Sequence, residues 1–241
     1  MGITADDIPY VFTNDRRQLL GFDVEMAQRL AADLGVTPQF VRFERDAMAE
    51  HVRARAVDIV MTGARLTPLR AEAVIVSASY LDETLAFVTL DHDRQRFTTW
   101  ATIRERGRIR LGVQNLPYYI SAIEALLPDA DVSVIQEVTE RIDPASGFDA
   151  YVLPAERGSI VTMFNPRFAV VVPEGVPIRM PLVYPLAGDD AAWTRFVDAW
   201  IALKKRDGFI DALYEHWIRG RAVSHPRPRW SVVRDVLGWV E

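Results

Sequence analysis

Strand-like and helix-like segments alternate along the chain, and this alternation limits the fold more than any other feature. The segment FDVEMAQRLAADLG has large apolar residues at four-residue spacing and ends at Gly35, which predicts a helix that stops there. These apolar residues are Phe22, Met26, Leu30 and Leu34. Next come the strand TPQFVRF, the helix DAMAEHVRAR and the buried strand VDIVMTG. Short strand-helix-strand connections favour right-handed crossovers and a largely parallel sheet.

The alternation returns in the second half of the chain. The segments TTWATIRERG, RIRLGV, LPYYISAIEALLP, DVSVIQ and FDAYVLP predict helix, strand, helix, strand and strand. A helix AERGSIVTMF and a strand RFAVVVP follow, and two helices, DDAAWTRFVDAWIALKKRD and GFIDALYEHWIRG, come last. Two such blocks predict an α/β protein with two lobes.

Composition limits the function classes. The chain has 241 residues, of which 49% are hydrophobic and 25% charged, and no apolar run approaches the roughly 20 residues that span a membrane. The start MGITADDIPY lacks the pattern of a signal peptide, so we expect a cytosolic protein, a mature secreted one, or a piece of a longer protein. The absence of cysteine excludes disulfides and thiolate metal sites, and the net charge of -5 argues against nucleic-acid binding.

Motifs of catalysis are absent from the sequence. It contains no G-x-S-x-G, no H-E-x-x-H and no glycine-rich phosphate loop. Its four histidines, which are scattered rather than paired, are His51, His92, His216 and His225. We therefore predict no catalytic residue, no metal site and no cofactor.

The segment TGARLTPLR combines a helix start with two cations. Thr67 and Pro68 are typical of a helix N-terminus, which already carries partial positive charge, so Arg65 and Arg70 nearby cost about 0.3–1 kcal/mol. Either an anion binds there or the placement is accidental. Accident is a real alternative, because only Lys204 and Lys205 among the 28 basic residues are lysine.

The order of motifs resembles the type II periplasmic solute-binding proteins, in particular those that bind amino acids. The resemblance extends to about Ala222 and rests on seven segments: IPYVF, LLGFDVEMAQRLAADLGV, VDIVMTGARLTPLR, SASYLDETLAFV, RIRLGVQ, FDAYVL and FVDAWIALKKRDGFIDALYEHWIRG. It implies two lobes, each a mostly parallel sheet flanked by helices, joined by two crossing hinge strands, with a ligand enclosed by closure of a cleft.

The resemblance also implies domain boundaries. Lobe 1 would be discontinuous and take residues 1–84 and 186–222, and lobe 2 would take residues 85–185. The tail 223–241, together with AERGSIVTMFNPRFAVVVPEG, resembles binding domains at the C-terminus of dicarboxylate symporters, in which an upstream membrane domain would export the lobes. The tail would dock on the domain, contact a membrane surface, or simply end the chain, and we favour docking.

In the family, the arginine of the T-x-x-R motif binds a ligand carboxylate, and Arg70 has that position here. The alternative is a surface arginine paired with Glu72 or Asp82. Arg65 stands where the family has Ser or Thr, and Arg45 where it commonly has an aromatic residue. If all three face the cleft, the ligand should carry more than one negative charge, since buried unpaired cations cost several kcal/mol. Otherwise Arg45 and Arg65 turn to solvent.

Further ligand contacts are expected by analogy with the family. They are Thr62 and Gly63 in the same segment, Asp7 and Tyr10 in a loop that faces the cleft in relatives, and four residues of the segment QNLPYYI in lobe 2. In lobe 2 these are the amide donors Gln114 and Asn115 and a hydroxyl from Tyr118 or Tyr119, although a buried core tyrosine explains either one equally well.

The usual partners of a ligand amine are missing. The family's two acidic positions align with Pro154 and Thr4, so an amine would need Asp7 or Glu156, and both also fit plain loop or helix acids. This weakens a zwitterionic amino acid as the ligand. It favours a dicarboxylate, or an acidic amino acid with a rearranged amine site.

The sequence thus predicts a monomeric, non-catalytic, periplasmic or otherwise extracytoplasmic domain. It would capture a small organic anion and present it to a membrane transporter, either separate or fused upstream. One alternative is an extracytoplasmic dehydratase on the same fold, with Glu156 as its acid or base. Another is the ligand-sensing domain of a receptor.

Overall fold

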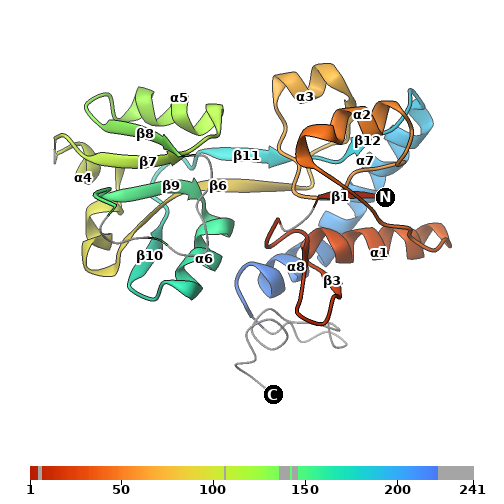
Figure 1. Ribbon diagram of the computed structural model, residues 1–241, viewed down its shortest axis with the longest axis horizontal. Coiled ribbons are helices and arrows are strands. Elements are labelled where there is room, and N and C mark those ends of the chain that lie inside the picture. The colour runs from red at the N-terminus through yellow and green to blue at the C-terminus, as the bar shows by residue number, and fades with distance from the viewer. Residues whose placement is uncertain (5–6, 106, 136–141, 143–145, 222–241) are drawn as a thin grey trace. The chain divides into compact units, whose positions relative to one another are not determined.

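The chain folds into two compact α/β units. The computed structural model describes residues 1–4, 7–105, 107–135, 142 and 146–221. Unit 1 takes Met1–Asp82 and the chain from Pro181, and unit 2 takes Glu83–Met180. The changes of unit fall after residues 82 and 180, inside β6 (Leu81–Leu90) and β11 (Arg179–Leu182), whereas the sequence places them after 84 and 185. The α/β class is as predicted, and the tail 223–241 lies outside the described residues (Figure 1).

Unit 1 is built from short strands and helices drawn from both ends of the chain. Its strands are β1 (Gly2–Thr4), β2 (Phe12–Thr13), β3 (Leu19–Leu20), β4 (Val41–Phe43), β5 (Ile75–Val76) and β12 (Pro185–Leu186). Its helices are α1 (Phe22–Leu34), α2 (Met48–Arg53), α3 (Pro68–Ala73), α7 (Ala191–Arg206) and α8 (Phe209–Trp217), with a 3-10 turn η1 at Arg45–Ala47. β1 pairs with β4 in parallel, and β12 with β5 in antiparallel orientation.

The prediction of a regular strand at VDIVMTG is wrong. Its residues form isolated bridges, Gly2 with Val60 and Ile59 with Leu186, to two different neighbours. The N–H of Met61 donates to Gly2 O, and the N–H of Val60 to Pro185 O, so backbone groups are satisfied without a ladder. The segment is nevertheless buried, as its apolar composition predicts.

Helix starts and stops follow their sequence signals. Phe22, Met26 and Leu30 of α1 are fully buried, while Leu34 is 39% exposed at the last turn. Gly35 ends the helix in a left-handed conformation at φ 69°, as predicted. The side chain of Thr67 accepts the N–H of Arg70 at the start of α3, which confirms the helix start read from TGARLTPLR.

Unit 2 has one mixed sheet with the order β10, β6, β9, β7, β8. Besides β6 its strands are β7 (Arg110–Gln114), β8 (Asp131–Ile135), β9 (Ala150–Pro154) and β10 (Phe168–Val171). Its helices are α4 (Trp100–Arg104), α5 (Pro117–Leu126) and α6 (Ala155–Phe164), with a 3-10 segment η2 at Asp91–Phe97. β7 runs parallel to β8 and β9, but β6 runs antiparallel to β9 and β10. The sheet is therefore mixed rather than mostly parallel.

Alternating side chains fill both faces of this sheet. On β9, Val152 joins the cluster that α5 covers, and Leu153 joins the cluster that contains Val161 of α6. β6 alternates in the same way, with Phe87 on the first face and Val88 on the second. Figure 1 accordingly shows α5 and α6 on opposite faces of the strands.

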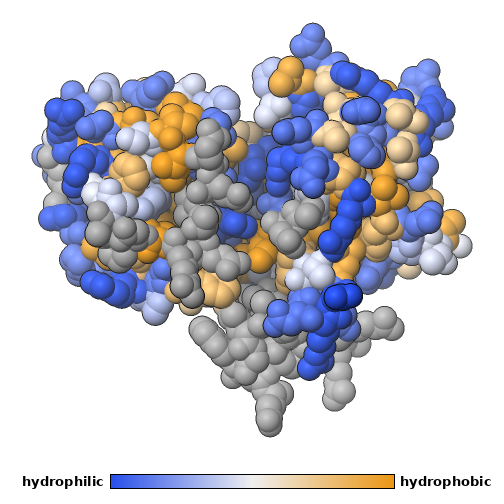
Figure 2. All heavy atoms as spheres, in the orientation of Figure 1, coloured by the Kyte–Doolittle hydropathy of each residue, from blue (hydrophilic) through white to orange (hydrophobic). Residues whose placement is uncertain are grey.

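The described residues on the face drawn in Figure 2 are mainly polar. On the face drawn in Figure 2, hydrophilic side chains surround smaller apolar areas, as expected for a chain that is 25% charged. Among the helices of the described residues, none has both the length and the apolar character needed to cross a membrane.

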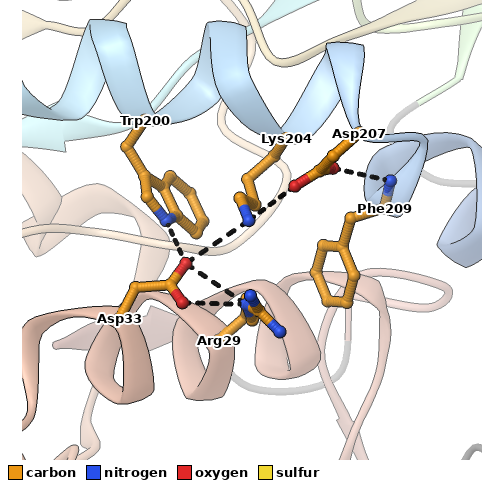
Figure 3. A network of polar contacts seen from close by, with 6 residues as sticks. All are labelled: Arg29, Asp33, Trp200, Lys204, Asp207 and Phe209. Carbon is orange, nitrogen blue, oxygen red and sulfur yellow. Dashed lines mark hydrogen bonds and ion pairs between the residues drawn. The ribbon is translucent and has the colours of Figure 1, made fainter.

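A buried lysine joins the two sequence segments of unit 1. Lys204 of α7 is 3% exposed, and its Nζ lies 3.5 Å from Asp33 Oδ2 on α1 and 2.7 Å from Asp207 Oδ2 (Figure 3). Asp33 also accepts the indole N–H of Trp200 at 2.9 Å. A cation that is removed from water requires such partners, so these contacts hold α7 on α1.

We predict that Lys204→Met lowers the free energy of unfolding by about 2 kcal/mol, since two carboxylates lose a charged donor. The matched control is Arg206→Met, two positions further along α7 and exposed, for which we expect a change within about 0.5 kcal/mol. Urea unfolding followed by circular dichroism measures both. Equal changes in the two variants would contradict the role assigned to Lys204.

Candidate functional site

Three arginines of unit 1 lie close enough to act on one another. Arg70 is half-buried, and its pKa is lowered first by burial and then by the positive charges of Arg45 and Arg65. Its Nη1 donates to the backbone carbonyl of Arg65, which fixes the guanidinium beside the start of α3. The side chains that the sequence singled out by charge are thus neighbours in the folded unit.

One aspartate contributes negative charge to this group, which we call the arginine cluster: Arg45, Arg65 and Arg70. Arg45 Nη2 lies 2.6 Å from Asp7 Oδ2, and the Asp7 side chain is 13% exposed. Within the described residues, no ion pair joins Arg70 to Glu72 or Asp82, the surface partners that the alternative interpretation requires. The arginine cluster therefore consists of three cations. Asp7, which the sequence analysis named as a possible ligand contact, is paired with one of them.

A completely buried carboxyl group contacts the loop that leads into Arg65. Asp23, at the second position of α1, accepts the N–H of Gly63 at 2.5 Å and the hydroxyls of Tyr80 and Tyr184 at 2.9 Å each. Burial raises the pKa of Asp23 to about 7 against the opposing effect of these three donors, and the negative charge of Asp7 adds to the rise. A carboxyl group thus fixes the chain two residues before Arg65.

Gly63 has no room for a side chain. Its φ is +62°, and a Cβ there would lie 2.5 Å from Cδ2 of Tyr10. Tyr10 itself is 2% exposed, so its ring packs on the loop from inside the unit. The hydroxyl of Thr62 is 2.5 Å from that of Thr4 and also accepts the Thr4 N–H. In the described structure Thr62 and Tyr10 therefore support the loop.

The predicted contacts in unit 2 divide into exposed and buried groups. Asn115 is exposed, and Tyr118 is 50% exposed at the first turn of α5. Tyr119 is fully buried, and its hydroxyl donates to Glu83 O at 3.5 Å, which matches the core alternative. Gln114 ends β7 with its Oε1 buried and without a hydrogen-bond partner among the described residues. Such an atom needs a donor from water or a ligand.

Glu156 is buried at the second position of α6. It is 1% exposed, and its Oε2 accepts the N–H of Thr84 at 3.2 Å. Pro154, which ends β9, is the residue before that helix. No group of three histidine, aspartate or glutamate side chains that could hold a metal ion occurs in the part of the chain that the structure describes.

The sequence analysis missed Asp23, Tyr80 and Tyr184. A signal for Asp23 was present, because positions 23, 26, 27 and 30 share one face of a helix, and the other three are fully buried apolar residues. A charged residue on that face requires buried partners. The two tyrosines gave no comparable signal, since they lie far from Asp23 in the sequence.

Two α/β units, connected through the paired strands β6 and β11, define the type II periplasmic binding fold. The chain matches the family model of bacterial extracellular solute-binding proteins, family 3, over residues 1–220. The protein belongs to this family.

Individual relatives share about a quarter of their residues with it. The chain is 24% identical to a cyclohexadienyl dehydratase of Pseudomonas aeruginosa, with 90% of this chain and 81% of the relative covered. It is 22% identical to a probable ABC transporter arginine-binding protein, ArtJ, of Chlamydia trachomatis, with 90% and 84% covered. The structure of an ancestral cationic amino acid solute-binding protein, AncCDT-1, matches with a TM-score of 0.70 at 23% identity, with 90% and 95% covered.

We predict that Gly63→Ala destabilises the protein by more than a left-handed alanine alone costs, about 1–2 kcal/mol. Gly35→Ala is the matched control, because its φ of +69° is similar but nothing lies within 4 Å of the added Cβ. Urea unfolding of both variants isolates the clash with Tyr10. Equal losses of stability would show that the loop yields to the added methyl group.

Proposed function

We propose that this domain binds a small organic anion with more than one negative charge at the arginine cluster and delivers it to a membrane transporter. The observation that carries the proposal is the half-buried Arg70, whose charge is opposed by Arg45 and Arg65. The Asp7 carboxylate forms an ion pair with Arg45 of this cluster.

The proposal follows from the cost of holding a half-buried arginine close to two other cations, of which Arg45 has a side chain that is 43% exposed. Burial and neighbouring cations both work against a charged Arg70, and a guanidinium does not escape this cost by losing its proton. A carboxylate offsets the cost and accepts two parallel hydrogen bonds from one guanidinium. Arg45 and Arg65 add positive charge around a carboxylate bound at Arg70, which favours a ligand with a second negative group, such as a dicarboxylate or an acidic amino acid.

The names of the relatives support a broader class of solute for the proposal. The names of two of them specify arginine or cationic amino acids, and every amino acid offers a carboxylate that an arginine such as Arg70 can bind. A positively charged ligand side chain, however, would be repelled by Arg45 and Arg65. We therefore favour an anionic solute for this chain within a family of solute-binding proteins.

The setting that we propose is outside the cytoplasm, as the family description indicates, with a transporter as the partner. The transporter is either a separate complex or a membrane domain fused upstream, as in a symporter. The sensor domain of a receptor has the same requirements within the lobes, and the neighbouring polypeptide distinguishes it.

A dehydratase is the second candidate, because one relative bears that name. Its acid or base would be Glu156, which is buried in unit 2 and accepts a backbone N–H. Turnover of a cyclic carboxylic acid by the wild-type protein, lost in Glu156→Gln, would put this candidate first.

We predict that succinate, malate, aspartate or glutamate raises the melting temperature, since a ligand at 100 times its dissociation constant adds about 2.7 kcal/mol of stability. Arg70→Gln should abolish the response, and Arg65→Gln should weaken it most for ligands with two carboxylates. Arg206→Gln, on the exposed face of α7, is the control for a general change of charge. Stabilisation by neutral or cationic amino acids only, in a thermal-shift series, would overturn the anion assignment.

Asp7→Asn tests whether Asp7 competes with the ligand for Arg45. We predict that succinate binds about fivefold more tightly to this variant, a change of about 1 kcal/mol, because Arg45 loses its 2.6 Å partner. Isothermal calorimetry measures the change, with the exposed Asp46→Asn as the matched control. If Asp7 instead binds a ligand ammonium group, aspartate and glutamate will bind more weakly and succinate will be unaffected.

A further inference from the structure

The carboxyl group of Asp23 connects four separate pieces of unit 1. Asp23 lies in the first turn of α1, Gly63 in the loop before Arg65, Tyr80 immediately before β6, and Tyr184 between β11 and β12. Three hydrogen bonds join them, one from an amide and two from phenols. Because the donor at Gly63 is a backbone amide, this contact fixes the position of the main chain itself.

We propose that Asp23 is a positioning residue, which holds the Gly63 amide and with it the main chain that leads into Arg65 and Arg70. The second part of the proposal is that anion binding by the arginine cluster is coupled to protonation of the Asp23 carboxyl group. The coupling rests on the proposed function, whereas the positioning does not.

The direction of the coupling follows from the groups that face Asp23. These are the phenols of Tyr80 and Tyr184 and the carboxylate of Asp7, with Tyr10 acting on Tyr80. Asp7, which pairs with Arg45, already raises the pKa of Asp23. A ligand carboxylate bound to Arg45, where Asp7 lies, would raise the pKa of Asp23 in the same way, so under this proposal Asp23 takes up a proton from solution when the anion binds.

The two protonation states hold Gly63 differently. An ionised carboxylate accepts all three donors, and its bond from the Gly63 amide is charge-assisted. A protonated Asp23 must donate its own hydrogen, which a phenol oxygen can accept by turning its hydroxyl, whereas the amide of Gly63 cannot reverse. Anion binding and the strength of the Gly63 contact are therefore linked through one proton.

The pKa of about 7 in the folded protein lies above the ordinary value of 3.8. Asp23 therefore contributes stability that is complete below about pH 3.8 and is lost as the pH rises to about 7. In ligand-free protein, the stability of the wild type relative to Asp23→Asn should fall over this range and stay constant above it.

The ligand-free wild type provides a test that needs no variant and no ligand. In a nitrogen–proton spectrum the Gly63 amide proton should move upfield as the pH falls, with a midpoint near 7, because it loses a charged acceptor. A Gly63 amide shift that is constant between pH 5 and 9 would overturn the proposal, whatever the ligand is.

Calorimetry with succinate tests the coupling. At pH 7 in two buffers of different ionisation enthalpy, the wild type should take up protons on binding, and its affinity should rise several-fold between pH 8.5 and 6.5. Asp23→Asn should show neither effect. His51→Gln is the control, because His51 stacks on Phe43 of the same unit and is not among the described groups that act on Asp23; this variant should retain the uptake.

Equal proton uptake in wild type and Asp23→Asn would overturn the coupling. If no anion of the series binds the wild type, the proposed function fails and the coupling fails with it. The Gly63 amide titration then still decides whether Asp23 positions the loop.

Discussion

The hydrogen bond from the Gly63 amide to Asp23 is the constraint on which the loop that leads into Arg65 depends. The segment before the loop forms isolated bridges instead of a regular strand, so a sheet ladder does not fix its course. The Asp23 carboxyl and the Tyr10 ring fix it instead, one by accepting the Gly63 N–H and the other by occupying the space of a side chain. Arg65 and Arg70 stay close together at the start of α3 because these two contacts fix the main chain at Gly63.

Charges of both signs lie along this part of unit 1. Arg45 and Arg65 act on Arg70, Asp7 pairs with Arg45, and Asp23 accepts the Gly63 N–H two residues before Arg65. Burial raises the pKa of Asp23 to about 7, so at neutral pH this group carries less negative charge than a solvated aspartate would. The positive charge that remains is what an anionic solute would meet. A protein selecting arginine needs the reverse arrangement around the ligand side chain.

Local signals in the sequence predicted the helices well and the sheets less well. The apolar spacing and Gly35 located α1, and Thr67 with Pro68 located the start of α3. β6 was not named as a strand from its own residues, and only the resemblance implied hinge strands in the chain; its residues 85–89 are buried without interruption. The arginines of the site could be named because charge is visible in a sequence. Asp23 could not be connected to Tyr80 and Tyr184, since that contact joins positions 57 and 161 residues apart.

Two of the buried acids among the described residues, Asp23 and Glu156, are held in the same way, which bears on the choice between binding protein and enzyme. Asp23 and Glu156 each occupy the second position of a helix, where the helix dipole favours a negative charge, and each accepts a backbone N–H from another segment, Gly63 or Thr84. A catalytic acid must exchange its proton with a substrate. A carboxyl group that holds β6 in place would have to give up that contact to do so. The parallel with Asp23 therefore favours a structural role for Glu156, and with it a binding protein.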